Sequence, residues 1–259
     1  MEQGAEWVVY EHPLSERVRF LLRLEFLFAQ YRVQRADATP WGLRASLHTL
    51  LDLLSVMGRA DLRTDLVKEL SDQHAALTRL GKRPDINQER LTATLTLLGG
   101  AVAELQGMGS SHPAMVLRGN EFLFAILNRS SIPGGVCGFD LPAYHSWLSR
   151  PHPQTEHDLD GWLANLLPIE RAINLYLRLL RESTEAAAHT AEGGVYLQVA
   201  QSAYQLVRVH LQAPEIYPEI SAGKHRVSIR FMRQPEVNAR AVQAGGSISF
   251  RLQCCLLGH

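Results

Sequence analysis

The hydrophobic pattern of this 259-residue chain changes its period at Gly193-Gly194. Before the two glycines, apolar residues recur every three or four positions, which is typical of amphipathic helices. After them, apolar and polar residues alternate over short stretches bounded by glycine and proline, which is typical of strands. We therefore predict an α+β protein, with a mainly α-helical domain at residues 1–190 and a β-strand domain at residues 191–259.

The clearest predicted strand covers residues 224–233, where alternate side chains point to opposite faces of a sheet. One face carries Arg226, Ser228 and Arg230, whereas the other is apolar and consists of Val227, Ile229 and Phe231. Further strands are predicted at about residues 195–200, 204–212 and 246–255. Prolines between the strands predict turns, at Pro214, Pro218 and Pro235. An antiparallel sheet with one apolar and one arginine-bearing face suits an acidic ligand better than the interior of an enzyme.

The N-terminal half is predicted to be a helical bundle preceded by a short strand. Residues 6–10 favour a strand that stops before Pro13 and completes the sheet. Helices are predicted after Ser15, after Pro40, at about 61–80, 87–105 and 113–128, from Asp140 to Pro151, and at about 158–166 and 168–182. Short connections favour antiparallel packing of neighbouring helices. Asp140 is predicted to cap the short helix, because an acidic residue before Pro142 is a helix-start signal.

Charge and composition narrow the class of protein. The chain has 26 basic and 26 acidic residues, and this zero net charge argues against a nucleic-acid binder. From Glu192 onward, seven Lys or Arg face four Glu, so the strand region is mildly basic. The acidic N-terminus lacks the pattern of a secretion signal, and no apolar run approaches the ~20 residues of a membrane span. We predict a cytoplasmic protein without membrane insertion. Three cysteines, two of them adjacent, do not suggest a disulfide framework.

An enzymatic interpretation would use Cys137, Asp140 and His145 as nucleophile, orienting acid and base of a hydrolase. Sequence proximity carries little weight, because such triads are assembled by the fold. The favoured interpretation is structural, with a buried cysteine after a turn, a capping aspartate and a histidine on a short helix. We therefore predict no catalytic residues.

Neither a metal nor an organic cofactor is predicted. His152 and His157 lie in a polar stretch that favours a solvated loop, and no ligand pair with the spacing of a zinc site occurs. The glycine pairs lack the lysine and serine or threonine of a phosphate-binding loop.

The arginines of the strand region allow two interpretations. Arg208, Arg226, Arg230 and Arg251 can form the solvated face of a two-layer sheet, or a site for a peptide or another anion. Guanidinium groups side by side on adjacent strands need an anion to offset their repulsion, which favours the second interpretation. The residues alone leave both open.

Several motifs, in order from about residue 8 to 255, resemble the ZapD family of Z-ring-associated cell division proteins. These are Glu11-His12-Pro13-Leu14, Arg63-Thr64, Lys68-Glu69-Leu70, Ser131-Ile132-Pro133-Gly134-Gly135, Phe139-Asp140-Leu141-Pro142, Trp147-Leu148, Tyr217-Pro218, Ile229-Arg230-Phe231-Met232 and Cys254-Cys255. The resemblance implies a non-enzymatic, cytoplasmic homodimer recruited to the division site at mid-cell. Proteins of this family bind the C-terminal tail of the tubulin-like protein FtsZ through basic residues and bundle its filaments.

The resemblance also implies which residues bind the FtsZ tail. The matching positions are Arg19, Arg23, Arg118, His145, Arg226 and Arg230. We expect the arginines of the first helix and of the strand to contribute to one tail-binding surface. Two features depart from the family pattern: Glu121 follows Arg118 where further basic residues can occur, and Leu256–His259 extend beyond Cys255.

Overall fold

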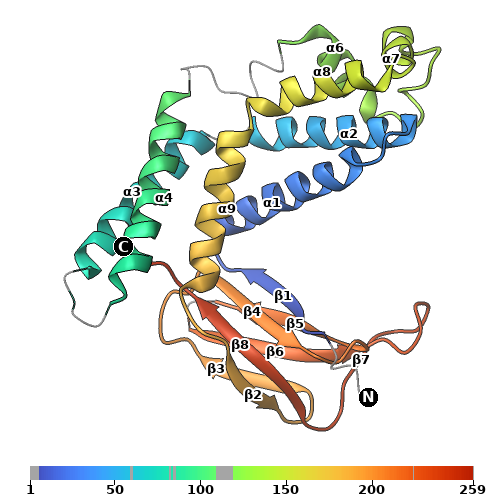
Figure 1. Ribbon diagram of the computed structural model, residues 1–259. Coiled ribbons are helices and arrows are strands. Elements are labelled where there is room, and N and C mark those ends of the chain that lie inside the picture. The colour runs from blue at the N-terminus through green and yellow to red at the C-terminus, as the bar shows by residue number, and fades with distance from the viewer. Residues whose placement is uncertain are drawn as a thin grey trace, which may run out of the picture. The chain divides into compact units, whose positions relative to one another are not determined.

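The computed structural model describes residues 6–58, 61–81, 83, 86–108, 119–223 and 225–258. The predicted α+β class is confirmed, with helices first and antiparallel sheets last (Figure 1). The chain divides into two compact units. We call residues 1–20 with 177–258 the β unit, and residues 21–176 the helical unit.

Eight helices are described, labelled as in Figure 1. They are α1 (Glu16–Arg35), α2 (Pro40–Met57), α3 (Leu62–Leu80), α4 (Gln88–Gly107), α6 (Glu121–Ser130), α7 (Pro142–Leu148), α8 (His152–Ala164) and α9 (Leu167–Glu182). The N-termini of α2, α4 and α6 are capped by side-chain oxygens. Thr39, Asn87 and Asn120 accept hydrogen bonds from main-chain N–H groups of the first turn.

Two predictions for the helical part were wrong, and a third can be followed only in part. Of the helix predicted at 113–128, residues 113–118 lie outside the described residues, and the described helix runs from Glu121 to Ser130. Asp140 does not cap α7, whose N-cap residue is Leu141 without a side-chain hydrogen bond. His152 and His157 lie in α8 rather than in a loop, since Pro153 sits in the first turn, where a helix needs no N–H group.

The strands form two antiparallel sheets. They are β1 (Val8–Pro13), β2 (Ala187–Ala191), β3 (Val195–Val199), β4 (Leu206–Leu211), β5 (Ile216–Ala222), β6 (Arg226–Arg233), β7 (Val242–Gln243) and β8 (Ile248–Cys255). Sheet A has the order β1-β4-β8-β2, and sheet B has the order β3-β6-β5 with β7 also paired to β6. The prediction that the N-terminal strand joins the sheet is confirmed by its pairing with β4.

The sequence did not reveal β2, β5 and β7, and it placed all strands in one sheet. Pro218, predicted to mark a turn, lies in the middle of β5. A proline is accommodated there because β5 is an edge strand and the Pro218 nitrogen needs no ladder partner. The N-terminal strand also continues through Pro13 instead of stopping after Tyr10.

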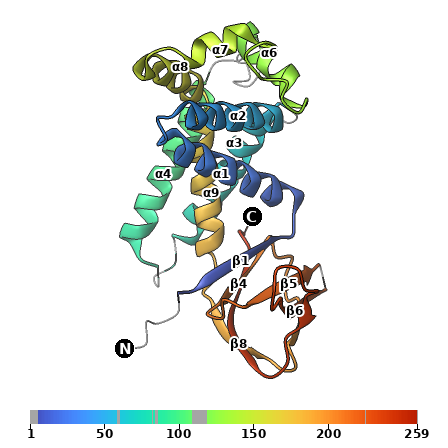
Figure 2. The same ribbon diagram turned by 90° about the vertical axis from the view of Figure 1, so that its right-hand side faces the viewer.

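The two sheets face each other across one apolar core (Figure 2). Val227, Ile229 and Phe231 are fully buried, which confirms the alternation predicted for this strand. Phe231 of sheet B contacts Phe250 of sheet A, with ring centroids 5.0 Å apart. The side chains between these residues on β6 therefore point outward, away from the core.

Glu11 of β1 lies at the centre of an ion-pair network within the β unit. Its carboxylate accepts two hydrogen bonds from Arg181, in the last turn of α9, each 2.8 Å long. It also accepts one of 2.7 Å from Arg208 of β4. Arg208 in turn donates to Gln253 of β8 at 2.9 Å. The network thus joins three neighbouring strands, β1, β4 and β8, and the end of α9, four segments far apart in sequence.

The environment of Glu11 favours its charged form. Burial raises the pKa of Glu11, but the hydrogen bonds and charges of Arg181 and Arg208 outweigh burial and hold the pKa below its ordinary value. The folded state therefore binds the Glu11 proton less tightly than the unfolded state does. The resulting stability is present at neutral pH and is lost as pH falls through the lowered pKa.

We predict that Glu11→Gln destabilises the β unit by about 2–3 kcal/mol at pH 7, because two partly buried arginines lose their carboxylate. The difference from the wild type should begin to shrink near the ordinary value of 4.5 and disappear below the lowered pKa of Glu11. Hydrogen exchange of the β4 amides in increasing urea measures this difference. Glu219→Gln is the matched control, since Glu219 pairs with an arginine at an exposed site. Equal effects of the two substitutions would contradict the prediction.

Candidate functional site

The outward side chains of β6 form the candidate site, which we call the β6 face: Arg226, Ser228 and Arg230. Two rows flank it, exposed except for the half-buried Val195, and the strand register gives their members. Val195, Leu197 and Val199 of β3 lie opposite Arg230, Ser228 and Arg226, respectively. Glu219 and Ser221 of β5 lie opposite Arg230 and Ser228 on the other side. The face therefore combines two cations with an apolar strip, an arrangement suited to a ligand with carboxylate and apolar groups.

The two arginines of the β6 face differ in their partners. Arg230 donates a 2.7 Å hydrogen bond to Glu219, and both side chains are largely exposed. For Arg226, no carboxylate lies within ion-pair distance among the described residues. Arg226 is therefore available to an acidic ligand at once, whereas Arg230 must exchange the Glu219 carboxylate for that of the ligand.

The other two arginines predicted for this face lie in sheet A, so the prediction of four cations side by side was wrong. Arg208 is held by Glu11 and Gln253 and is mostly buried. The guanidinium of Arg251 stacks over the Trp7 ring, with its central carbon 4.7 Å from the ring centroid. Neither arginine belongs to the same surface as Arg226 and Arg230.

The remaining predicted tail-binding residues are divided between the two units. Arg19 belongs to the β unit, where it pairs with Glu16 at 3.2 Å and donates to the Pro13 carbonyl. Arg23 and His145 belong to the helical unit, where both are exposed. Arg118 lies outside the described residues.

The residues of the enzymatic alternative do not form a triad in the described structure. The Cys137 thiol donates to Asp140 at 3.5 Å, and Asp140 also lies 3.8 Å from Arg129. No hydrogen bond joins His145 to either residue in the part of the chain that the structure describes. Asp140 therefore accepts from Cys137 and faces Arg129, rather than orienting a base.

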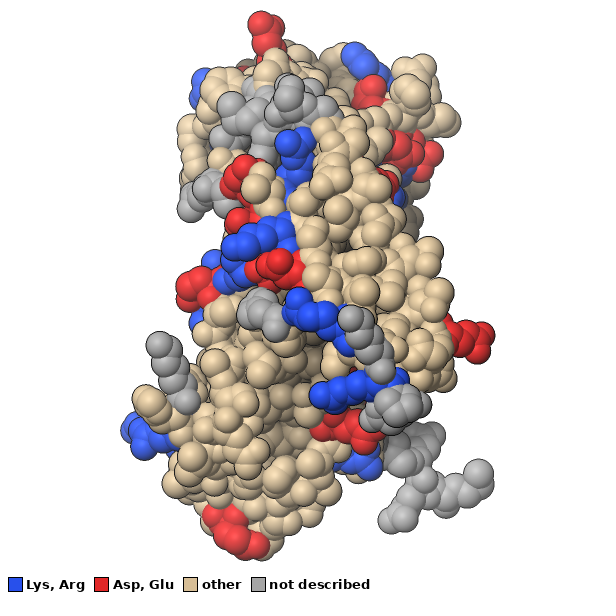
Figure 3. Space-filling view, turned by 90° about the vertical axis from the view of Figure 1, so that its left-hand side faces the viewer, with Lys and Arg blue, Asp and Glu red and all other residues tan. Residues whose placement is uncertain are grey.

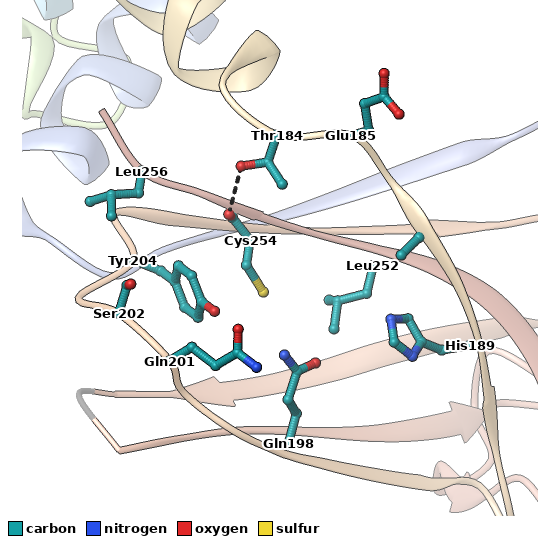
Figure 4. Close-up of a pocket in the computed structure, with 11 residues that line it drawn as sticks. Thr184, Glu185, His189, Gln198, Gln201, Ser202, Tyr204, Leu252, Cys254 and Leu256 are labelled. Carbon is teal, nitrogen blue, oxygen red and sulfur yellow. Dashed lines mark hydrogen bonds between the residues drawn. The ribbon is translucent and has the colours of Figure 1, made fainter. Parts of the chain in front are cut away.

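A cavity that sequence reasoning missed opens between β2 and β3 of the β unit. Its volume is about 410 Å³. The lining includes His189, Gln198, Gln201, Tyr204 and Cys254, and Figure 4 shows the Cys254 sulfur and both glutamine amides pointing toward the same space. Burial raises the pKa of the Cys254 thiol, so the thiol form is favoured. No alternation pattern predicts this space, because it depends on how two edge strands from different sheets lie.

Charged residues are sparse on the face of the β unit that Figure 3 shows. In the lower part of Figure 3, uncharged surface predominates, and basic and acidic atoms lie toward its margins. On this face, the basic atoms in the lower part of the view lie in separate groups rather than in one large basic surface.

We predict that Arg208 and Arg230 differ in structural importance although both lie on strands. Arg208→Gln should lower the stability of the β unit by about 2 kcal/mol, because it removes charge-assisted hydrogen bonds at a mostly buried site. Arg230→Gln should change it by less than about 0.5 kcal/mol, because its ion pair is exposed. Exchange of the β4 amides in urea compares the two variants. A larger effect of Arg230→Gln would mean that the β6 face is structural.

No helix among the described residues has the length and hydropathy needed to cross a membrane. The sequence profile of the ZapD family of cell division proteins matches residues 22–230. The cell division protein ZapD of Azoarcus sp. (strain BH72) is 41% identical over 252 residues, covering 96% of this chain and all of the relative. Those of Aromatoleum aromaticum and Dechloromonas aromatica are 41% and 40% identical, again over 96% of this chain and 98% and 100% of the relatives.

These matches extend over most of the chain and include the β6 face. They confirm the resemblance found in the sequence and the prediction of a cell division protein that is not an enzyme. The chain belongs to the ZapD family of cell division proteins.

Proposed function

We propose that this protein binds the C-terminal tail of FtsZ through the β6 face and, as a homodimer, cross-links FtsZ filaments into bundles that promote Z-ring assembly. The observation that carries the proposal is the exposed pair Arg226 and Arg230 on one face of one strand. Family membership supplies the cell-division context. The proposed place of action is the cytoplasmic side of the division site at mid-cell.

Binding would rest on charge-assisted hydrogen bonds from guanidinium to carboxylate groups. A guanidinium presents several donors in a plane and matches a carboxylate with two parallel hydrogen bonds. A flexible tail loses conformational freedom when it binds, so each single site should bind with moderate affinity. Arg226, which has no carboxylate within ion-pair distance in the part of the chain that the structure describes, would make the first contact, and Arg230 would follow after leaving Glu219.

Bundling requires two tail sites on one particle, whereas tail binding does not. A symmetric dimer presents the same site twice and can therefore connect two filaments. Each filament carries many tails, so the second attachment occurs at high effective concentration and raises the overall affinity without a new contact. This is why the proposal needs the homodimer as well as the basic face.

Arg19, Arg23 and His145 are further proposed contacts for tail carboxylates, each judged on its own element. Arg23 and His145 are exposed, and Arg19 would have to release Glu16. Arg118 remains a proposed contact on the family resemblance alone, since it lies outside the described residues.

We predict that the double substitution Arg226→Glu and Arg230→Glu abolishes co-sedimentation with FtsZ filaments while leaving the circular dichroism spectrum unchanged. Two exposed cations become anions, which repel an acidic tail. The charge-matched control is Arg79→Glu with Arg83→Glu, two exposed positions of the helical unit. The wild-type protein should also fail to co-sediment with filaments of FtsZ that lacks its C-terminal tail. Unchanged co-sedimentation of the Arg226 and Arg230 variant would refute the proposal.

Glu219 is predicted to compete with the tail for Arg230, because their ion pair occupies the guanidinium. Glu219→Gln should therefore tighten binding of an FtsZ tail peptide about threefold, the scale of one exposed ion pair. Fluorescence anisotropy with a labelled peptide measures the change. Glu215→Gln, an exposed glutamate before β5, alters net charge equally without touching the pair. If both variants bind the peptide equally, Glu219 does not compete.

A further inference from the structure

The two sheets have four edge strands, and only some of them are protected against pairing with another chain. Sheet A ends at β1 and β2, and sheet B ends at β3 and β5. Edge strands are commonly protected by charged residues or proline. β1 contains Glu11 and Pro13, and β5 contains Pro218 and Glu219. β2 and β3 contain neither: β2 reads Ala-Ala-His-Thr-Ala, and β3, which reads Val-Tyr-Leu-Gln-Val, is the one of the two with large apolar side chains.

The register shows which main-chain groups of β3 face away from the sheet. The Phe231 N–H donates to the Gly194 carbonyl, and the Ala200 N–H donates to the His225 carbonyl. Hydrogen-bonded pairs recur at every second residue of an antiparallel ladder, so the residues between them point their N–H and C=O groups outward. Leu197 and Val199 are such residues, and no hydrogen bond to their main chain occurs within the described residues.

The outer surface of this edge is apolar with a cation beside it. Leu197 is 66% exposed and Val199 is 76% exposed. Arg226 lies directly opposite Val199 on β6. A strand added beside β3 would lie about 10 Å from β6, two strand spacings away. That distance is within reach of an arginine and a glutamate extending toward each other, so an acidic residue would fit near the Val199 end.

The inner side of the same edge faces the cavity between β2 and β3. Gln198 alternates with Leu197 and Val199 and therefore points inward, where it lines the cavity (Figure 4). The Tyr196 hydroxyl donates to the Gln198 side-chain oxygen at 3.0 Å, which fixes the glutamine and leaves its NH₂ group for a ligand. An inward side chain of an added strand would enter this space beside Gln198 and Cys254.

We propose that an extended acidic segment of a partner binds as an additional strand on the free edge of β3. Its outward apolar side chains would pack on Leu197 and Val199, one inward side chain would occupy the cavity, and a carboxylate would reach Arg226. This inference rests on the proposed function, in which that segment is the FtsZ tail. A second copy of β3 is the less suitable occupant, because its sequence supplies no carboxylate for Arg226.

The decisive variant is Leu197→Pro, which removes an N–H group that the β3–β6 ladder does not use. Binding of an FtsZ tail peptide, measured by anisotropy, should weaken about tenfold, because the added strand loses a main-chain bond and its neighbours. Leu197→Ala keeps the N–H and should weaken binding far less. In the wild-type protein, peptide binding should slow hydrogen exchange of the Leu197 and Val199 amides.

The possible outcomes distinguish a failure of strand addition at β3 from a failure of the proposed binding of the FtsZ tail. A peptide that binds without protecting the Leu197 and Val199 amides overturns the added strand and leaves tail binding intact. If the wild type binds no tail peptide, the proposed function fails and this inference fails with it. Should Leu197→Pro dissociate the dimer while peptide affinity stays unchanged, the edge pairs with a second copy and the proposal is wrong. The hydrogen-exchange measurement uses the wild-type protein, so it tests strand addition at β3 even if the proline variant does not fold.

Discussion

The β unit depends on one carboxylate. Glu11 lies between Arg181 and Arg208, and this network joins the first strand to its neighbour β4 and to the end of α9. Without Glu11, two cations with about one-fifth of their side chains exposed would face each other with no anion between them. Such an arrangement is costly in a region of low dielectric constant. The strand that begins the chain is therefore fixed to the last part of it, and sheet A has its fourth strand.

The same network decides which arginines remain available for a partner. Arg208 and Arg226 look alike in the sequence, since each stands next to a valine that alternates with polar residues. Arg208 is used internally because Glu11 and Gln253 occupy the positions opposite it. Arg226 has Val199 opposite it on β3, and no carboxylate of the described residues lies within ion-pair distance of its guanidinium. The identity of the cross-strand neighbour, not the alternation, separates an arginine that is used within the fold from one that stays available to a ligand.

This distinction explains how far the sequence could be interpreted. Alternation correctly predicted the buried and exposed faces of β6, because side chains in a strand have a period of two whatever the partner. It could not show that Arg230 pairs with Glu219, because that pair depends on β5. Pro218 led to the prediction of a turn where β5 lies. The helical pattern was sufficient for α2, α3 and α4, whereas Asp140 was misassigned because Leu141 occupies the N-cap position. Strand neighbours and caps are set by tertiary structure, which a single sequence does not encode locally.

The unprotected edge of β3 departs from the rule that β1 and β5 follow. A short, uncharged, apolar edge strand exposes a folded protein to unwanted pairing, and the proline in β5 shows that this chain protects an edge elsewhere in the same sheet. Departures from local rules concentrate at functional positions, because binding needs surface that folding has not already satisfied. β3 offers three such features. Main-chain groups on its edge point away from the sheet, apolar side chains lie on its outer face, and a cavity lies on its inner side. A strand from a partner would satisfy all three at once, which neither solvent nor a free anion could do.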